Sequence, residues 1–377
     1  MKIAIITFHA SDNCGSQLQT YALSRVLQDH FGVTPDVIDY SNLHQQEVYA
    51  TFRKIHSVKD LVRILYRLLF LHLLKPYHQS FRDFISNHVH LTNDCYSLPE
   101  ELKTLDGKYD IYITGSDQVW NTKVYDFDDS YFLDFVTRGR KIAYATSLGA
   151  TNIIESSCDK IKYTKLLDDF SMLSVREKNA QLLLQTITDK PIELLLDPTL
   201  LLSKSDWDAL AGEEPLIKGK YIFYYAFTYA ENPNRIVKKL SEKYNMPVYI
   251  VDAKAWALRR MFMDGFKLAP QFGPMAFLNL IKYSELVLTT SFHGTALSVA
   301  LEKKFWFIKT PMLNPRDDRA TSLLNQLGLL DRLQEGDYLL SHDVFMPLEK
   351  TVSINELKQK SISYLTQALE VSKQDEL

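Results

Sequence analysis

The chain has 377 residues, of which 46% are hydrophobic and 24% are charged, and its 43 Lys and Arg nearly balance its 46 Asp and Glu. These proportions are typical of a globular protein and exclude whole-chain disorder, collagen and coiled coil. The net charge of −3 also excludes a general nucleic-acid binder, because neutralising phosphates requires an excess of basic residues.

The three cysteines, Cys14, Cys95 and Cys158, are odd in number and far apart, which indicates neither a disulfide framework nor a zinc site. The sequence contains no HExxH segment, so we expect no metal and no cofactor. Its first apolar run spans only Ile3 to Ile6, too short for a signal peptide, and no stretch reaches the roughly 18–20 apolar residues of a membrane-spanning helix. We therefore expect a cytoplasmic protein.

The first forty residues predict a β-α-β unit. A β-branched run at 2–8 is followed by the polar turn SDNCGS and by apolar residues at helical spacing, and Gly32 ends the helix. A second short strand follows at 36–40. Further candidates for buried strands are 109–115, 141–146, 171–175, 221–227, 247–251, 285–290 and 305–308, with helical patterns between most of them.

This alternation predicts an α/β fold of two doubly wound, Rossmann-like domains that face a cleft. The segment GEEPLIKGK, residues 212–220, is the best candidate linker. We therefore expect an N-terminal domain at 1–211 and a C-terminal domain at 212–377 that includes a C-terminal helix. Ligands of such folds bind at the carboxyl ends of the strands.

A basic helical insertion, about residues 51–90, interrupts the first domain. Its segment 51–82 carries seven Lys and Arg against one Asp, and its middle is very apolar. A core helix explains this pattern if its arginines lay their stems along apolar surface. We favour this core helix. The alternative is a basic amphipathic helix, which predicts peripheral contact with the inner face of the plasma membrane through residues 53–75.

Polar residues follow the first strand and directly precede the predicted helix. Asn13, Gly15 and Gln17 lie where free backbone amides and the positive end of a helix dipole suit a polar or anionic ligand. A capped helix N-terminus without a ligand explains the same residues.

The segment TGSDQVWN, residues 114–121, concentrates polar residues at the end of another strand. Ser116, Asp117, Gln118 and Asn121 supply hydrogen-bonding groups, and Trp120 supplies a face on which a sugar ring can stack. The alternative for Asp117 is the N-cap of a turn.

His293 lies at a strand-to-helix junction in TTSFHGTALSVAL. If Ser291 caps the helix, the amides of Gly294 and Thr295 face an anion in the cleft, with His293 beside them as a cation or proton donor.

Two arginines also lie in turns that lead into helices. Arg176, in SVRE, and Arg319, in NPRDDR, have guanidinium groups that can bind a carboxylate or a phosphate. An ion pair with Glu177 or another acidic residue is the alternative for Arg176. In NPRDDR the alternative is that Asp317 and Asp318 only cap the following helix.

Five segments, taken in order, resemble the motifs of the polysaccharide pyruvyl transferase family: NCGSQLQTYAL, TGSDQVWN, SVRE, LLLDPTLLL and TTSFHGTALSVAL. The resemblance implies the two-domain fold of the B-type glycosyltransferases. It also implies a reaction that places the enolpyruvyl group of phosphoenolpyruvate on two sugar hydroxyls as a cyclic ketal and releases phosphate. The sugar would belong to an exopolysaccharide or capsule precursor, and a lipid-linked oligosaccharide is one such acceptor.

The resemblance also assigns roles to the candidate residues. The donor would be bound by Arg176, His293, Ser291, Gly294, Thr295 and Arg319, and His293 would either protonate the methylene carbon or stabilise the leaving phosphate. The acceptor would be bound by Asn13, Gly15, Gln17, Ser116, Gln118, Trp120 and Asn121. Asp117 is then a candidate for the base that takes the proton of the attacking hydroxyl.

Two other functions fit the same cleft. A glycosyltransferase that uses a nucleotide sugar would also place cations and helix N-termini around a diphosphate. A carbohydrate-binding protein without catalytic activity could share the fold. Binding of phosphoenolpyruvate excludes the first, and phosphate release that depends on a sugar excludes the second.

Overall fold

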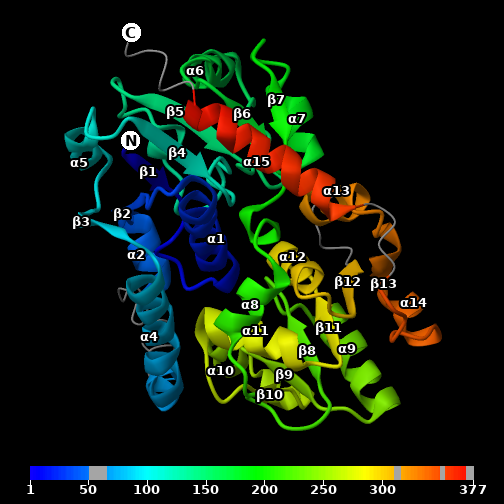
Figure 1. Ribbon diagram of the computed structural model, residues 1–377. Helices are drawn as coiled ribbons and strands as arrows, with labels where there is room; N and C mark the ends of the chain where they lie inside the picture. The colour runs from blue at the N-terminus through cyan, green and yellow to red at the C-terminus, as the bar shows by residue number, and fades with distance from the viewer. Residues whose placement is uncertain (51–65, 310–315, 349–352, 371–377) are drawn as a thin grey trace.

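The computed structural model describes residues 1–50, 66–309, 316–348 and 353–370. Two sheets, one above the other in Figure 1, divide the molecule into a first half built from β1–β7 and a second half built from β8–β13. Each strand pairing in the described part of the chain is parallel, and helices cover the sheets. The prediction of an α/β fold with two doubly wound domains is confirmed.

The sheet of the first half has the strand order β3-β2-β1-β4-β5. Its strands are β1 (Ile3–Ile6), β2 (Asp36–Tyr40), β3 (Leu91–Tyr96), β4 (Ile111–Gly115) and β5 (Arg140–Tyr144). The pair β6 (Leu173–Val175) and β7 (Ile192–Leu194) continues it through isolated bridges from Ile142 to Met172 and from Thr146 to Val175. The strand order reverses between β1 and β4, which is where ligands of such sheets bind.

The sheet of the second half has the order β10-β9-β8-β11-β12-β13, with its own reversal between β8 and β11. Its strands are β8 (Ile222–Tyr225), β9 (Val248–Ile250), β10 (Lys267–Leu268), β11 (Leu286–Thr289), β12 (Phe305–Lys309) and β13 (Leu333–Glu335). Residues 212–220 connect the last helix of the first half to β8.

The helices pack on both sides of the two sheets. Those up to residue 211 are α1 (Cys14–Phe31), α2 (Leu43–Tyr49), α4 (Leu71–His88), α5 (Pro99–Leu102), α6 (Ser157–Asp168), α7 (Lys178–Leu184) and α8 (Lys204–Ala211). Those that follow are α9 (Glu231–Tyr244), α10 (Ala253–Leu258), α11 (Gly273–Tyr283), α12 (Phe292–Ala300), α13 (Arg319–Gln326), α14 (Gly336–Ser341) and α15 (Ile354–Glu370). Short 3-10 helices are η1 (Lys103–Leu105), η2 (Asp129–Phe132), η3 (Pro198–Leu200), η4 (Met261–Asp264) and η5 (Leu330–Arg332).

One hydrophobic core is shared by the two halves. In β1, Ile3 and Ile5 face a cluster that also contains buried residues of β8, α11 and α12, while Ala4 and Ile6 face a separate cluster on the other side of the sheet. This alternation follows from the two-residue period of a strand. The two halves therefore bury apolar surface against each other, and this packing holds the two sheets in a fixed relative position.

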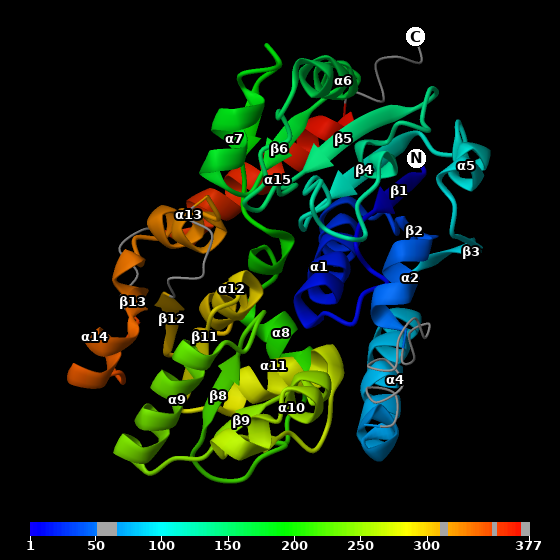
Figure 2. The same cartoon turned by 180° about the vertical axis from the view of Figure 1, so that it is seen from behind.

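The insertion in the first half reaches the second half. Its helix α4 runs beside both halves (Figures 1 and 2), and the ring of Tyr77 packs against Phe272 with centroids 6.0 Å apart. Of the expected membrane-contacting segment 53–75, residues 53–65 lie outside the described residues. Within the described ranges, no helix combines the length and the apolar character needed to cross a bilayer.

The C-terminal helix α15 packs on the first half, although we grouped it with residues 212–377. Tyr364 donates its hydroxyl hydrogen to the carbonyl of Ala143 at 2.8 Å, and Arg140 donates to the carbonyl of Ala368 at 2.9 Å. The apolar residues of α15 cover strand β5. More than two hundred residues separate the two elements in the chain, so local sequence patterns do not predict this contact.

Candidate active site

Arg176 lies directly after β6, and its side chain is only 1% exposed. Its Nη1 donates to Oδ2 of Asp197 at 2.6 Å, and its Nη2 donates to Oδ1 of Asp117 at 3.2 Å. The ring of Phe292, from the second half, covers the guanidinium plane at 4.3 Å from Cζ. Two carboxylates of the first half and one aromatic ring of the second thus fix the guanidinium.

His293 is the second residue of α12 and faces this arginine. Its Nε2 lies 3.4 Å from Nη1 of Arg176 and 3.7 Å from Oδ2 of Asp197. The helix is positioned by β11, whose end leads into the cap residue Ser291. The imidazole and the guanidinium that we assigned to the donor therefore meet where the two halves join.

Gly15, in the first turn of α1, lies against the imidazole. A Cβ atom at this position would lie 2.1 Å from Nδ1 of His293, so only glycine leaves room for the ring. Gly15 thus contributes to the site by leaving space for the imidazole ring. Its backbone amide donates a hydrogen bond to Oδ1 of Asn13 at 2.9 Å. Asn13 is the N-cap of α1, the alternative that the sequence left open.

The two carboxylates beside Arg176 are charged. Burial disfavours the charge of Asp117, but the guanidinium of Arg176 holds its pKa below the ordinary value. Burial acts in the same way on Asp197, yet the imidazole of His293 and the guanidinium hold its pKa far below the usual range. Asp117 also accepts a hydrogen bond from the Ser16 hydroxyl at 2.5 Å. A fully engaged carboxylate of low pKa is a weak proton acceptor, so the geometry speaks against Asp117 as the base.

A third carboxyl, that of Glu177, differs from the other two. Burial raises its pKa to about 7, although Arg176 and Arg319 lie near enough to lower it. Its Oε1 accepts hydrogen bonds from the amides of Leu148 and Gly149 at 2.8 and 3.3 Å, and its Oε2 is buried without a hydrogen bond. Glu177 is therefore the carboxyl of the site that can change its charge near neutral pH.

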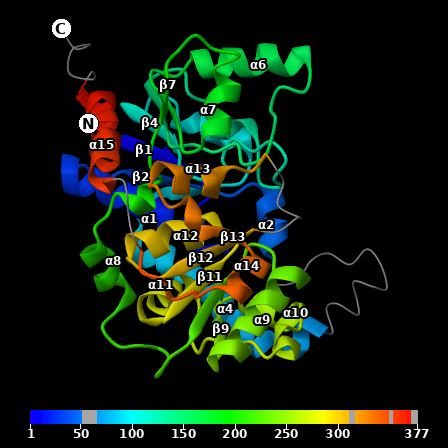
Figure 3. The same cartoon turned by 90° about the vertical axis from the view of Figure 1, so that its right-hand side faces the viewer.

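Arg319 enters the site from the second half, at the start of α13, which lies between α7 and α12 in Figure 3. Its Nε and Nη2 donate to the two carboxylate oxygens of Asp317 at 2.8 and 2.6 Å. Burial acts to lower the pKa of Arg319, but the hydrogen bonds and charge of Asp317, followed by the charges of Glu177 and Asp117, leave that pKa raised. The sequence predicted a capping role for Asp317, whereas the structure pairs it with Arg319, whose guanidinium borders the Arg176 cluster.

The backbone amides after His293 are not offered to a ligand as we expected. The amide of Gly294 donates to the Ser291 side chain at 3.4 Å, and the amide of Thr295 donates to the Ser291 carbonyl at 3.0 Å. The Thr295 side chain is fully buried and also bonds to that carbonyl. These three residues cap and pack the helix, because its first turn folds back on its own N-cap.

The assignment of Trp120 to a sugar-stacking surface is wrong. The side chain is 0% exposed, its ring stacks on Phe132 at a centroid distance of 4.8 Å, and its Nε1 donates to the carbonyl of Tyr131 at 3.1 Å. The residues of η2 thus cover both the ring and its polar atom. Trp120 is a core residue, because no face remains free to stack on a ligand.

Two further residues assigned to the acceptor instead hold the site together. The Ser116 hydroxyl is buried and bonds to the carbonyl of Ala145 and to Asp197, at 2.8 and 3.1 Å. Gln17 donates to the carbonyls of His9 and Ser11 and fixes the loop after β1. Neither side chain is available for a sugar as the structure stands.

Gln118 and Asn121 support a loop that lines a cavity. Asn121 donates to the Gln118 side chain at 2.9 Å and accepts a hydrogen bond from Thr151, and a Cβ atom at Gly149 would lie 2.3 Å from Gln118 Oε1. Both residues therefore set the course of residues 148–152. The acceptor role assigned to them stays a prediction.

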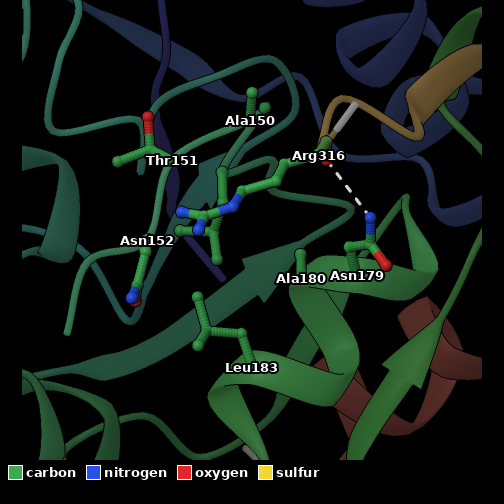
Figure 4. Close-up of a pocket in the computed structure, with 9 residues that line it drawn as sticks. Ala150, Thr151, Asn152, Asn179, Ala180, Leu183 and Arg316 are labelled. Carbon is green, nitrogen blue, oxygen red and sulfur yellow. Dashed lines mark hydrogen bonds between the residues drawn. The ribbon is translucent and has the colours of Figure 1, made fainter. Parts of the chain in front are cut away.

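The cavity beside this loop has a volume of about 310 Å³ and lies where the halves meet (Figure 4). Its walls combine apolar side chains with amide, hydroxyl and guanidinium groups: Leu148, Gly149, Ala150, Thr151, Asn152, Asn179, Ala180, Leu183 and Arg316. Asn179 donates to the carbonyl of Arg316 at 3.2 Å, so a contact between the first half and the second lies in the wall of the cavity. Through Leu148 and Gly149 it adjoins Glu177 and the ionic cluster.

Three acidic residues of this site were not predicted as functional residues from the sequence: Asp197, Glu177 and Asp317. Glu177 and Asp317 were read only as ordinary partners or caps, and Asp197 only as part of LLLDPTLLL. The sequence signal for Asp197 was its position after an apolar run and directly before Pro198, a pattern in which an Asp side chain caps a turn. In the structure, Oδ1 of Asp197 accepts hydrogen bonds from the amide and the hydroxyl of Thr199. Its second oxygen, which binds Arg176, gave no sequence signal. In the described part of the chain no group of three or more His, Cys, Asp or Glu could hold a metal ion, and the expected lack of a metal or cofactor stays a prediction.

Comparison with known proteins bears on both family and fold. A family model for polysaccharide pyruvyl transferase matches residues 13–310, most of the chain. Comparison with curated proteins gave no match.

Among solved structures, the UDP-GlcNAc 2-epimerase of Methanocaldococcus jannaschii, crystallised with UDP-GlcNAc and UDP, has a TM-score of 0.53 at 14% identity and covers 97% of this chain and 100% of its own. Another UDP-N-acetylglucosamine 2-epimerase has a TM-score of 0.50 at 11% identity, over 96% of this chain and 94% of its own. The E. coli heptosyltransferase WaaC has a TM-score of 0.38 at 12% identity and covers 86% of this chain and 98% of its own. At these identities the likeness to the two epimerases shows the fold alone, and the predicted B-type glycosyltransferase fold is confirmed.

Proposed function

Because the chain belongs to the polysaccharide pyruvyl transferase family, we propose that it transfers the pyruvyl group of phosphoenolpyruvate to two hydroxyls of a sugar. The methylene carbon of the donor gains a proton, two C–O bonds form at the neighbouring carbon, and the C–O bond to phosphate breaks. Of the two hydroxyl protons, one replaces the proton given to carbon and the other leaves with the phosphate. The products are a cyclic pyruvate ketal and inorganic phosphate.

The observation that supports this donor most strongly is the 3.4 Å separation of His293 Nε2 and Arg176 Nη1. An unprotonated Nε2 can accept a hydrogen bond from Nη1. When Nε2 is protonated, two N–H groups lie beside each other and require an acceptor. An oxygen of a small anion accepts from both. Phosphoenolpyruvate carries a carboxylate and a phosphate, and Arg319 brings a further guanidinium to the same region.

His293 is then the residue that gives the proton to the methylene carbon. The charge of Asp197, 3.7 Å from Nε2, stabilises the protonated imidazole, and the Arg176 ion pairs fix the guanidinium. A positioned acid of this kind contributes roughly 100- to 10,000-fold to a rate. The ring regains its proton from an attacking hydroxyl, which requires no separate carboxylate base.

For the acceptor we propose the cavity lined by residues 148–152, α7 and Arg316. Its volume of about 310 Å³ lies at the small end of the roughly 300–1,000 Å³ range of ligand sites, which suits one sugar ring. Ala150, Ala180 and Leu183 offer an apolar wall to the C–H face of a ring. Asn152 and the guanidinium of Arg316, which extends across the cavity in Figure 4, offer hydrogen bonds to hydroxyls.

The proposal is tested by following phosphate release from phosphoenolpyruvate with a panel of methyl hexopyranosides and with UDP-GlcNAc in separate reactions. Release that requires a glycoside supports pyruvyl transfer. Thermal stabilisation by UDP-GlcNAc but not by phosphoenolpyruvate would instead favour a glycosyltransferase. Stabilisation by a glycoside without any turnover of phosphoenolpyruvate would favour a carbohydrate-binding protein.

A further inference from the structure

The tip of the insertion and the second half together expose an apolar surface with basic surroundings. Four large side chains contribute to it: Leu68 and Leu69 are 48% and 69% exposed, and Phe262 and Met263 are 41% and 69% exposed. Arg259 and Arg260 are exposed directly before the second pair. We call Leu68, Leu69, Arg259, Arg260, Phe262 and Met263 the tip patch.

The two segments of the tip patch are in contact through aromatic residues. The Tyr66 hydroxyl donates to the carbonyl of Ala257 at 3.1 Å, and the ring of Phe70 lies against Trp256 with centroids 6.5 Å apart. Trp256 in turn contacts Phe262 at 5.2 Å. Leu68 and Leu69 lie in the helical stretch between Tyr66 and Phe70, so the exposed apolar side chains come from two segments that contact each other.

The charge of this region is positive. The guanidinium of Arg260 lies 5.6 Å from the Tyr66 ring, at the join of the two segments, and Lys75 and Lys267 are exposed nearby on α4 and β10. The acidic groups that face the same elements are Asp252, which caps α10, and Asp264, which Asn234 contacts at 3.4 Å. Basic residues therefore outnumber acidic ones around the exposed apolar side chains.

Single exposed apolar residues are ordinary on protein surfaces, but a contiguous group that is bordered by arginines is typical of a contact site. We propose that the tip patch binds the surface of an anionic lipid bilayer, with Leu68, Leu69, Phe262 and Met263 entering the headgroup region and the arginines contacting lipid phosphates. Both halves of the molecule contribute, through residues 66–70 of the insertion and through α10 and η4 of the second half.

The test is flotation of the full-length protein with vesicles of phosphatidylcholine containing one third phosphatidylglycerol, and with vesicles of phosphatidylcholine alone. The wild type should float with the anionic vesicles only, and salt should weaken the binding. The pair Leu69→Glu and Met263→Glu should lower the bound fraction about tenfold or more, because two carboxylates replace the inserting side chains.

A matched pair, Ile161→Glu and Leu182→Glu, controls for the added charge. These residues are 72% and 56% exposed on α6 and α7, at the opposite end of the molecule in Figures 1 and 2. The control should float like the wild type, and so should Lys160→Glu with Lys165→Glu on α6, whereas Arg259→Glu with Arg260→Glu should not.

Three outcomes would overturn the proposal. The wild type fails to float with anionic vesicles, the control pair loses as much binding as the tip pair, or the wild type binds phosphatidylcholine vesicles equally well. Association of the wild type into dimers that Leu69→Glu abolishes, without flotation, would show that a second copy of the chain covers the tip patch. None of these results depends on the reaction that the enzyme catalyses.

Discussion

His293 Nε2 lies 3.4 Å from Arg176 Nη1, although 117 residues separate the two in the chain. The arginine follows β6 of the first half and the histidine follows β11 of the second, so both occupy carboxyl ends of parallel strands. Each is held by the other half as well: Phe292 covers the guanidinium, and Gly15 makes room for the imidazole. The site exists only where the halves meet.

We predict that Gly15→Ala lowers kcat about 100-fold, because the added methyl group displaces the imidazole by an ångström or more. Alanine is the better helix former, so the substitution should not weaken α1 by itself. The control is Gly336→Ala, whose Cβ would lie 2.4 Å from Cγ1 of Ile236, away from the site. That variant should lose stability and keep its kcat. Normal kcat for Gly15→Ala would show that the imidazole position is not critical.

Arg176→Ala should cost about 3–5 kcal/mol of unfolding free energy, because Asp117 and Asp197 remain as buried, unpaired carboxylates. Donor binding is therefore better tested with Arg176→Lys, which keeps the charge but cannot reach both carboxylates in the same geometry. We expect a KM for phosphoenolpyruvate raised about tenfold or more, since a charge-assisted hydrogen bond is weakened.

Urea denaturation and donor kinetics of these variants separate the two effects. Arg332→Ala removes another buried arginine, 2% exposed, whose partners include the carbonyl of Met346. It should lose stability without changing the KM. If Arg176→Ala has the same unfolding free energy as the wild type, the carboxylates beside Arg176 are not charged, contrary to our assignment.

The pKa of Glu177, raised by burial from 4.5 to about 7, predicts a pH-dependent stability. Between these two pKa values the Glu177 carboxyl is protonated in the folded protein but ionised in the unfolded chain. Its contribution to the free energy of unfolding is therefore fully present below about pH 4.5 and is lost as pH rises through about 7. Glu177→Gln mimics the protonated form. Relative to the wild type it should gain about 2 kcal/mol between pH 5 and pH 8, since one pKa unit corresponds to about 1.4 kcal/mol.

Urea denaturation of both proteins at the two pH values measures this difference. If the wild type and Glu177→Gln respond to pH in parallel, the carboxyl keeps the same charge over this range, and it is not the titrating group of the site.

Ala150→Trp should fill part of the acceptor cavity with an indole ring. The KM for the best glycoside of the panel should rise about tenfold or more while the affinity for phosphoenolpyruvate stays the same, because the two ligands occupy separate places. Ala230→Trp, at the start of α9, is the control. If Ala150→Trp changes the affinity for phosphoenolpyruvate and leaves the KM for the glycoside unchanged, the acceptor does not bind in this cavity.

Local signals predicted the first unit of the fold closely. The predicted strand at 36–40 is β2, and the predicted helix is α1, which ends before Gly32 with a φ of +67°. Glycine adopts this conformation without strain, so the end of the helix is encoded in a single residue. The position of His293 at a strand end was predictable in the same way, from a buried run followed by a cap residue.

Contacts between distant segments were not predictable. A tryptophan shortly after a strand has the same local pattern whether it faces a ligand or the core, and only Phe132 decides that Trp120 is buried. Similarly, nothing near Asp197 shows that one of its oxygens binds Arg176, because the two meet through the pairing of β6 with β7 and the turn that follows. The docking of α15 on β5 depends on the complementary surface of the first half.

The most direct test of the account is calorimetric titration of phosphoenolpyruvate into the wild type, His293→Ala and the control His30→Ala, whose exposed side chain lies near the end of α1. The account predicts saturable binding to the wild type and to the control, and binding at least about tenfold weaker to His293→Ala, which lacks one charge-assisted contact. Equal affinity of His293→Ala and the wild type, or no binding of phosphoenolpyruvate to a wild type that binds UDP-GlcNAc, would contradict it.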